Sequence, residues 1–85
     1  MKLVFSETAW EEYAAWLQRD RTVLKKVNAL IKAIMADPFE GIGKPEPLKH
    51  DLAGYWSRRI TQEHRIVYKV MPGELWIAKV GKHYE

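Results

Sequence analysis

Apolar and polar residues alternate most clearly between residues 55 and 70, which read YWSRRITQEHRIVYKV. Two segments rich in aromatic and β-branched residues, 55–61 and 64–70, flank a short polar break, which is typical of an antiparallel hairpin. Strand side chains alternate between faces, so a loop over residues 61–63 puts Arg59 and Arg65 opposite each other on one face. A two-residue loop would instead put these two arginines on opposite faces of the sheet. The other face carries the expected core residues Trp56, Ile60, Ile66, Tyr68 and Val70.

Helical periodicity dominates the first half of the chain. Residues 2–5 are apolar and β-prone and predict a strand, after which Ser6 is a suitable N-cap for a helix over residues 7–19. The stripe expected to face the core has the spacing i, i+3, i+4, i+7 and consists of Trp10, Tyr13, Ala14 and Leu17, with Trp16 beside it.

A second helix is predicted directly after the first, with Asp20 as its N-cap. Pro38 disfavours helix at the residue before it, so this helix should end by Asp37. Its expected buried stripe is Val23, Val27, Leu30, Ile31 and Ile34. The two helices together form an αα-hairpin.

The remaining pattern predicts short strands joined by turns. Residues 39–47 contain Gly41, Gly43, Pro45 and Pro47 and are expected to form a loop. We expect a short strand at residues 48–52, a tight turn at 71–74, a final strand at 75–80 and a tail at 81–85. The predicted fold is α+β, with an N-terminal strand and an αα-hairpin packed on one face of a mainly antiparallel twisted sheet. The other face of the sheet is then available for function.

Composition narrows the class of protein. The chain has 85 residues and no cysteine, so it is expected to be a single domain (residues 1–85) without disulfides or thiolate metal ligands. It has no apolar run long enough to span a membrane and begins without a signal-peptide pattern, so a cytoplasmic protein is expected. The formal net charge is +3. The first forty residues balance their charges, so the surplus lies in residues 41–85 and favours an anionic partner, RNA or DNA first.

Six side chains could carry chemistry on the available face: Glu46, Lys49, Arg59, Arg65, His83 and Tyr84. A metal site is not expected, because His50, His64 and His83 are far apart in sequence and no metal-binding motif surrounds them. The proline-containing loop also does not fit a phosphate-binding loop, which leads directly into a helix.

RNA cleavage by side chains alone fits these residues. The 2′-hydroxyl attacks the adjacent phosphorus while a base removes its proton, an acid protonates the leaving 5′-oxygen and a cation stabilises the developing charge. Glu46 could be the base, His83 the acid and Arg65 the cation. Lys49 and Arg59 could bind phosphates, and Tyr84 could stack on a base or position the phosphate.

Each of these residues also has a simpler interpretation. Glu46 could be a solvated loop acid, and Arg58, Arg59 and Arg65 could be ordinary surface charges on strands. His83 and Tyr84 lie near the C-terminus, where side chains are often frayed. The residues alone therefore support a basic α+β domain, with RNA binding as one hypothesis.

Longer motifs add a resemblance to a known family. The stretch GKPEPLKHDLAGYWSRRITQEHRIVYKV, residues 43–70, and the closing KHYE closely resemble YoeB-type toxins of the RelE/ParE superfamily. The likeness also includes KLVFSETAWEEY at the start and DPFEGIGKPEPLKH in the middle.

This resemblance implies a RelE-like fold and a type II toxin that cuts mRNA in the ribosomal A site without a cofactor. Matched by motif, the family's base falls on Glu46, its transition-state arginine on Arg65 and its acid on His83. Tyr84 matches the adjacent aromatic residue, and Lys49 and Arg59 match the phosphate-binding positions. The implied partners are a YefM-type antitoxin, the ribosome and its mRNA, and a second copy in a homodimer. The alternative within the superfamily is a ParE-like gyrase inhibitor without RNase activity.

Overall fold

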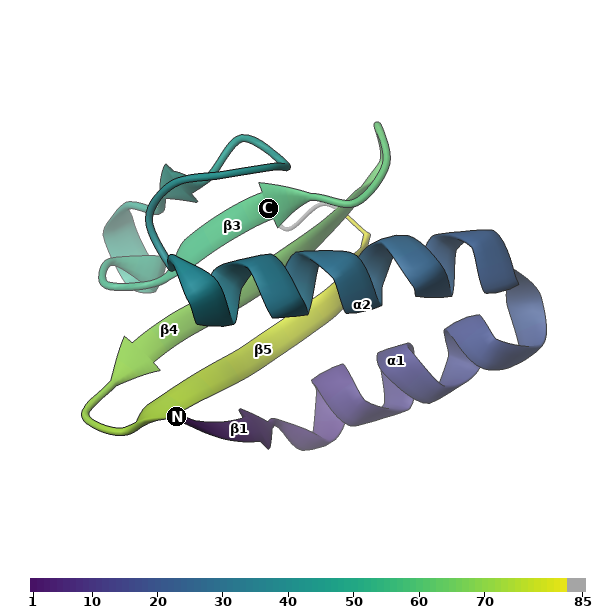
Figure 1. Cartoon of the computed structure of the whole chain (residues 1–85), viewed down its shortest axis with the longest axis horizontal. Coiled ribbons are helices and arrows are strands. Elements are labelled where there is room, and N and C mark those ends of the chain that lie inside the picture. Colours follow the sequence, from purple (N-terminus) through teal and green to yellow (C-terminus); the bar gives the residue numbers. More distant parts are fainter. Residues whose placement is uncertain (83–85) are drawn as a thin grey trace.

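The computed structural model describes residues 1–82 and contains a five-stranded sheet with two long helices (Figure 1). The elements in chain order are β1 (Lys2–Phe5), α1 (Glu7–Arg19), α2 (Arg21–Ala36), β2 (Glu46–Pro47), the 3₁₀ turn η1 (His50–Leu52), β3 (Trp56–Arg59), β4 (His64–Met71) and β5 (Glu74–Lys82). The strand order is β1-β5-β4-β3-β2; β1 pairs with β5 in parallel and the other neighbours are antiparallel. This confirms the predicted α+β fold.

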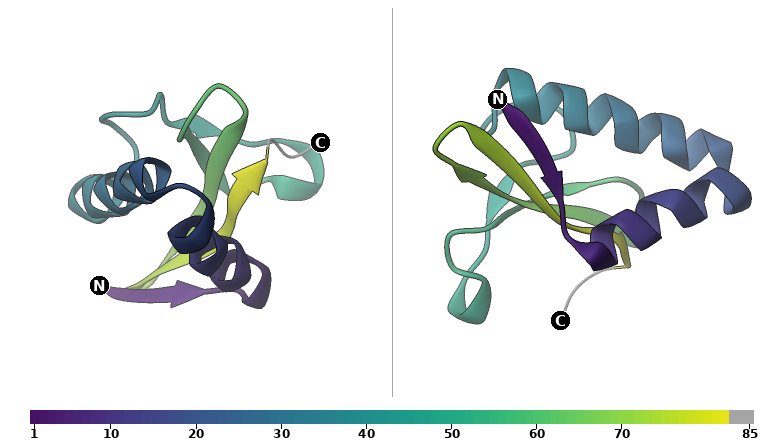
Figure 2. Two further views of the ribbon diagram at one scale, coloured as in Figure 1. Left: turned by 90° about the vertical axis from the view of Figure 1, so that its right-hand side faces the viewer. Right: turned by 90° about the horizontal axis from the view of Figure 1, so that it is seen from below.

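Both helices cover the same face of the sheet, as the two further views show (Figure 2). We call the opposite face the far face. The core lies between the helices and strands β3, β4 and β5, where burial of apolar side chains supplies the main stabilising term. Its buried residues are Ala9, Trp16, Val27, Leu30, Ile31, Ile34, Ile60, Ile66, Tyr68, Leu75, Ile77 and Val80. Among the described residues, no helix has the length and apolar character needed to cross a membrane.

Helix α1 has the predicted bounds and the predicted Ser6 cap, but its buried face differs from the prediction. Trp10 is 57% exposed and Leu17 is 45% exposed, whereas Ala9 and Trp16 are buried. The true inward face is shifted by one residue because polar groups of α1 also face the sheet. Of the predicted stripe, Tyr13 is partly buried and packs against the core. Trp10 is outside the core and stacks on Tyr13, with ring centroids 5.8 Å apart.

The shift has a hydrogen-bonding cause at the edge of β5. Strand β1 covers only the first part of that edge, because its register ends at Phe5 opposite Ile77. Beyond it, the Trp16 indole Nε1 donates to the Val80 carbonyl at 2.9 Å, and the Val80 amide donates to Glu12 Oε1 at 2.8 Å. Side chains of α1 thus form the hydrogen bonds to the β5 backbone that a neighbouring strand would otherwise form.

Helix α2 matches its prediction. The Asp20 carboxylate accepts hydrogen bonds from the amides of Thr22 and Val23, and the helix ends at Ala36 with Asp37 as C-cap. Within the predicted stripe, Val27, Leu30, Ile31 and Ile34 are buried and Val23 is partly buried.

Two strand assignments were wrong. The predicted strand at 48–52 is absent: the strand is Glu46–Pro47, inside the predicted loop, and residues 50–52 form η1. His50 has a positive φ of 57°, which turns the chain away from β3 after Leu48. The final strand is longer than residues 75–80 because Gly81 and Lys82, expected in the tail, still pair with Arg65 and His64.

Candidate active site

The β3–β4 hairpin brings two arginines together on the far face. Arg59 and Arg65 are direct register partners, as the three-residue loop predicted. Arg59 is exposed and Arg65 is partly buried, whereas Ser57, two residues before Arg59 on the same face, is only 3% exposed. On the far face, the two guanidinium groups therefore lie at one end of the β3–β4 hairpin, next to the buried Ser57.

The turn between these strands fixes the Arg65 side chain. Arg65 Nη1 donates to the carbonyls of Thr61, Gln62 and His64 at 3.0, 3.2 and 3.1 Å. The turn is itself held by Thr61 Oγ1, which accepts from the amides of Glu63 and His64. A guanidinium anchored in this way loses little side-chain entropy when it binds an anion.

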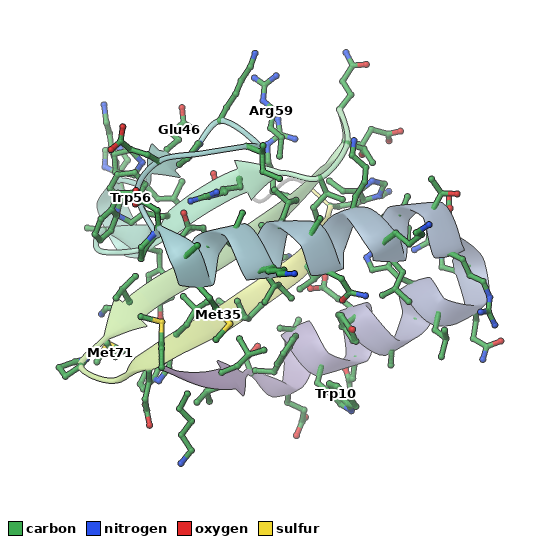
Figure 3. The ribbon with its side chains drawn as sticks, in the orientation of Figure 1. Trp10, Met35, Glu46, Trp56, Arg59 and Met71 are labelled. Atoms are coloured by element: carbon green, nitrogen blue, oxygen red, sulfur yellow. The ribbon has the colours of Figure 1, made fainter. Side chains whose placement is uncertain are left out.

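Glu46 reaches the same region from the other side of β3. The register pairs Glu46 with Ser57 in an antiparallel ladder, so Glu46 lies beside the strand that carries Arg59. The labelled side chains of Glu46 and Arg59 lie at the same edge of the molecule, above α2 in this view (Figure 3). Pro47 is tolerated because β2 is an edge strand.

These residues line one cleft of about 330 Å³. Its lining residues are Lys44, Pro45, Glu46, Pro47, Ser57, Arg59 and Arg65. The cations outnumber the single carboxylate, so the cleft attracts an anion while keeping one acid in reach of it. A general base, a guanidinium for a developing phosphorane charge and further cations for phosphates are the groups that RNA cleavage requires.

Lys49 lines a neighbouring hollow of about 300 Å³ that it shares with Glu46 rather than with Arg65. His83 and Tyr84 lie outside the described residues. The last described residue of β5, Lys82, pairs with His64, and Gly81 pairs with Arg65. The structure thus brings together Glu46, Arg59 and Arg65 of the predicted site and puts Lys49 next to Glu46.

The interpretation of Arg58 as a surface charge was wrong: Arg58 is 0% exposed. It lies on the core face of β3, opposite Ile66. Its Nε donates to the Tyr68 hydroxyl at 3.2 Å, and the Tyr68 hydroxyl donates to the Pro38 carbonyl at 2.6 Å. Burial raises the pKa of the Tyr68 phenol, although the hydrogen bond and charge of Arg58 act in the opposite direction. The strand alternation Trp56, Arg58, Ile60 is the sequence signal that identifies this arginine as inward-facing.

A second cavity, of about 520 Å³, adjoins Arg59 between α2 and the loops. Its apolar lining includes Leu30, Ile42 and Ile60, and Lys26 and Lys44 contribute charges. Sequence reasoning also missed this cavity, because it depends on how residues 41–44 fold against α2.

Comparison with known proteins identifies the family to which the chain belongs. The family model for the YoeB-like toxin of bacterial type II toxin–antitoxin systems matches residues 5–84. The chain belongs to the YoeB-like toxins. Toxin YoeB of Escherichia coli strain K12 is 55% identical over 84 residues, covering 99% of this chain and 100% of that protein. Toxin YoeB of Synechocystis sp. PCC 6803 is 53% identical over 85 residues, covering 100% and 99%.

Solved structures of YoeB-like proteins have the same fold. A YoeB/ParE toxin from Agrobacterium tumefaciens superposes with a TM-score of 0.95 at 48% identity, covering 99% of this chain and 100% of that one. The YoeB dimer from Staphylococcus aureus gives 0.92 at 46% identity, covering 99% and 98%. The heterotetrameric YoeB–YefM toxin–antitoxin complex from the same organism gives 0.90 at 46% identity, also covering 99% and 98%. The family prediction made from residues 43–70 is therefore confirmed.

Proposed function

We propose that this YoeB-like toxin is a ribosome-dependent endoribonuclease that cuts mRNA in the ribosomal A site. The observation that carries the proposal is that Glu46, Arg59 and Arg65 line one basic cleft in a member of this family. The cleft offers acid–base chemistry and anion stabilisation at one position, which a protein acting only by binding does not need.

In this mechanism, Glu46 accepts the proton of the 2′-hydroxyl as its oxygen attacks the adjacent phosphorus. Arg65 stabilises the charge on the phosphorane, with its guanidinium held by the turn carbonyls. His83 gives a proton to the 5′-oxygen as the phosphorus–oxygen bond breaks. Tyr84 stacks on a base or positions the phosphate, and Lys49 and Arg59 bind phosphates. The products are a 2′,3′-cyclic phosphate and a 5′-hydroxyl, and the reaction as written uses no cofactor.

The proposed partners follow from the related structures. The S. aureus relatives are a YoeB dimer and a YoeB–YefM complex, so we propose a YefM-type antitoxin as the inhibitor and a homodimer as an accessible state. An acidic amphipathic segment suits this surface, because Lys44 and Arg59 adjoin both the cleft and the apolar cavity next to it. We expect the protein to act in the cytoplasm, where its ribosome target lies.

The test is in vitro translation with the purified protein, followed by primer extension on the mRNA. Cuts at A-site positions that are lost in Glu46→Gln support the proposal. A ParE-like gyrase inhibitor would instead block DNA supercoiling and leave the mRNA intact. An RNA-binding protein without catalytic activity would bind in a salt-sensitive way and release no cleaved product.

A further inference from the structure

The loop that leads to Glu46 is attached to the sheet by its own carbonyl groups. This loop, residues 37–45, connects α2 to β2, and we call it the α2–β2 loop. Arg58 Nη2 donates to the carbonyls of Asp37 and Glu40 at 2.5 and 3.0 Å, and Nη1 donates to the carbonyl of Ile42 at 3.2 Å. One guanidinium therefore bonds to three carbonyl groups between residues 37 and 42 of the loop.

The environment of Arg58 is unusual for a buried charge. Buried arginines normally face a carboxylate, because an unpaired charge in the interior is costly. Within residues 1–82, the acceptors recorded for Arg58 are the loop carbonyls and the Tyr68 hydroxyl, all of them uncharged. Charge-assisted bonds to carbonyls are stronger than neutral ones, so this arginine strongly restricts the loop backbone.

Two glycines allow the loop to approach this closely. A Cβ atom on Gly41 would lie 3.1 Å from Arg58 Nη1, and one on Gly43 would lie 2.8 Å from Leu30 Cδ2. Both glycines also have positive φ values, 128° and 85°. The loop is thus shaped around the guanidinium, and larger residues at these positions would push it away.

Backbone hydrogen bonds link the end of the loop and Glu46 to β3. The Arg59 amide, next in sequence to Arg58, donates to the Gly43 carbonyl at 2.6 Å. Glu46 follows three residues later and pairs with Ser57, the residue before Arg58. Any shift of the loop relative to β3 therefore moves Glu46 relative to Arg59 and Arg65 on the same strand pair.

We infer that Arg58 is a positioning residue for Glu46: it holds the α2–β2 loop so that Glu46 faces the cleft arginines. Arg58 faces the core and does not line the cleft, so it acts through the loop rather than on substrate. The inference rests on the proposed function for its catalytic consequence, but the anchoring of the loop can be measured without any activity.

The first experiment measures hydrogen exchange of the Arg59 amide by NMR in Arg58→Met. We expect exchange at least about 10-fold faster relative to the core amides of β4, because the loop opens locally. The matched control is Leu75→Ala, a fully buried β5 position away from the loop, which should destabilise the whole fold without selective loss at Arg59. Arg58→Lys and Tyr68→Phe keep part of the network and should give smaller changes in the same direction.

The second experiment is a double-mutant cycle for mRNA cleavage on ribosomes. Arg58→Met should lower the cleavage rate at saturating ribosomes about 100-fold, because a misplaced base loses near-attack geometry, and leave ribosome affinity nearly unchanged. In the Glu46→Gln background the same substitution should lower the rate less than about twofold, since the two residues act as one unit. A structural role alone would lower rate and affinity together and in both backgrounds.

The outcomes separate the inference from the proposed function. Unchanged relative exchange at Arg59, or additive effects in the cycle, would overturn the positioning role even if the wild-type protein cleaves mRNA. Faster exchange with non-additive rates supports it. A folded wild-type protein that cuts no mRNA in translating ribosomes would overturn the proposed function, and the catalytic consequence for Arg58 with it.

Discussion

Adjacent arginines on β3 show how differently the two faces of this sheet are used. Arg58 faces the helices, is 0% exposed and bonds to the loop and to Tyr68. Arg59 faces away, is exposed and lines the cleft with Glu46 and Arg65. The same type of side chain therefore stabilises the structure on one face of the sheet and is available to a ligand on the other face. Strand alternation, rather than residue type, decides which role each arginine has.

The comparison predicts the largest effect on activity for Arg65→Ala on the far face. Removing a preorganised donor to a developing oxyanion costs about 10²–10³-fold in rate. The melting temperature should change little, because the partners of Arg65 are turn carbonyls that can bond to water. Single-turnover cleavage on ribosomes and a thermal melt measure the two quantities. Near-wild-type cleavage by Arg65→Ala would remove Arg65 from the mechanism.

The sharpest stability test substitutes methionine for each arginine of the pair. Arg58→Met should lower the free energy of unfolding by about 3 kcal/mol, because the buried Tyr68 hydroxyl and three partly buried loop carbonyls lose their donor. Arg59→Met should change it by less than about 0.5 kcal/mol, as for other exposed positions. Urea unfolding of both variants checks this. Equal losses would mean that the two faces do not differ as described.

A smaller effect is expected at the two tryptophans of α1. Trp16→Phe removes the indole donor to the Val80 carbonyl and should lower the free energy of unfolding by about 1–2 kcal/mol. Trp10→Phe, at a 57% exposed position, should stay within about 0.5 kcal/mol of wild type. Parallel denaturant titrations measure both, and a larger loss at Trp10 would contradict the observed inward face of α1.

The smallest effect is a pH dependence from Tyr68. Its pKa is raised by burial above the usual 10.0, so the neutral phenol stabilises the fold at neutral pH. Above about pH 10 the unfolded chain ionises first, and this stabilisation is lost as the pH rises through the folded pKa. The difference in unfolding free energy between wild type and Tyr68→Phe should be constant from pH 7 to about 10 and shrink above it. A constant difference up to pH 11 would exclude a raised pKa.

Local sequence signals predicted much of this fold. The caps Ser6 and Asp20, the stop before Pro38 and the register of Arg59 with Arg65 follow from short-range rules and are found as expected. The inward face of α1 was mispredicted because Glu12 and Trp16 bond to Val80, a partner 64 to 68 residues away. Periodicity counts apolar residues and gives no information on such long-range polar contacts.

The site could be predicted only where short-range sequence rules determine it. Arg59 and Arg65 follow from hairpin parity, and the chemistry of RNA cleavage suggested the roles proposed for Glu46 and Lys49, which the family resemblance then supported. The anchoring by Arg58 could not be derived, because it requires the path of residues 37–44 over β3. The prediction of a strand at 48–52 was wrong because His50 adopts a positive φ, which is uncommon for a residue other than glycine.

The most direct test of the proposed RNA cleavage maps mRNA ends in a translation reaction containing wild-type protein or Glu46→Gln. We expect wild-type cuts at A-site positions, with 5′-hydroxyl ends downstream, and a rate reduced by about 10²-fold or more in the variant. Unbroken mRNA with the wild-type protein, or equal cutting by Glu46→Gln, would contradict the claim that this cleft performs acid–base cleavage of RNA.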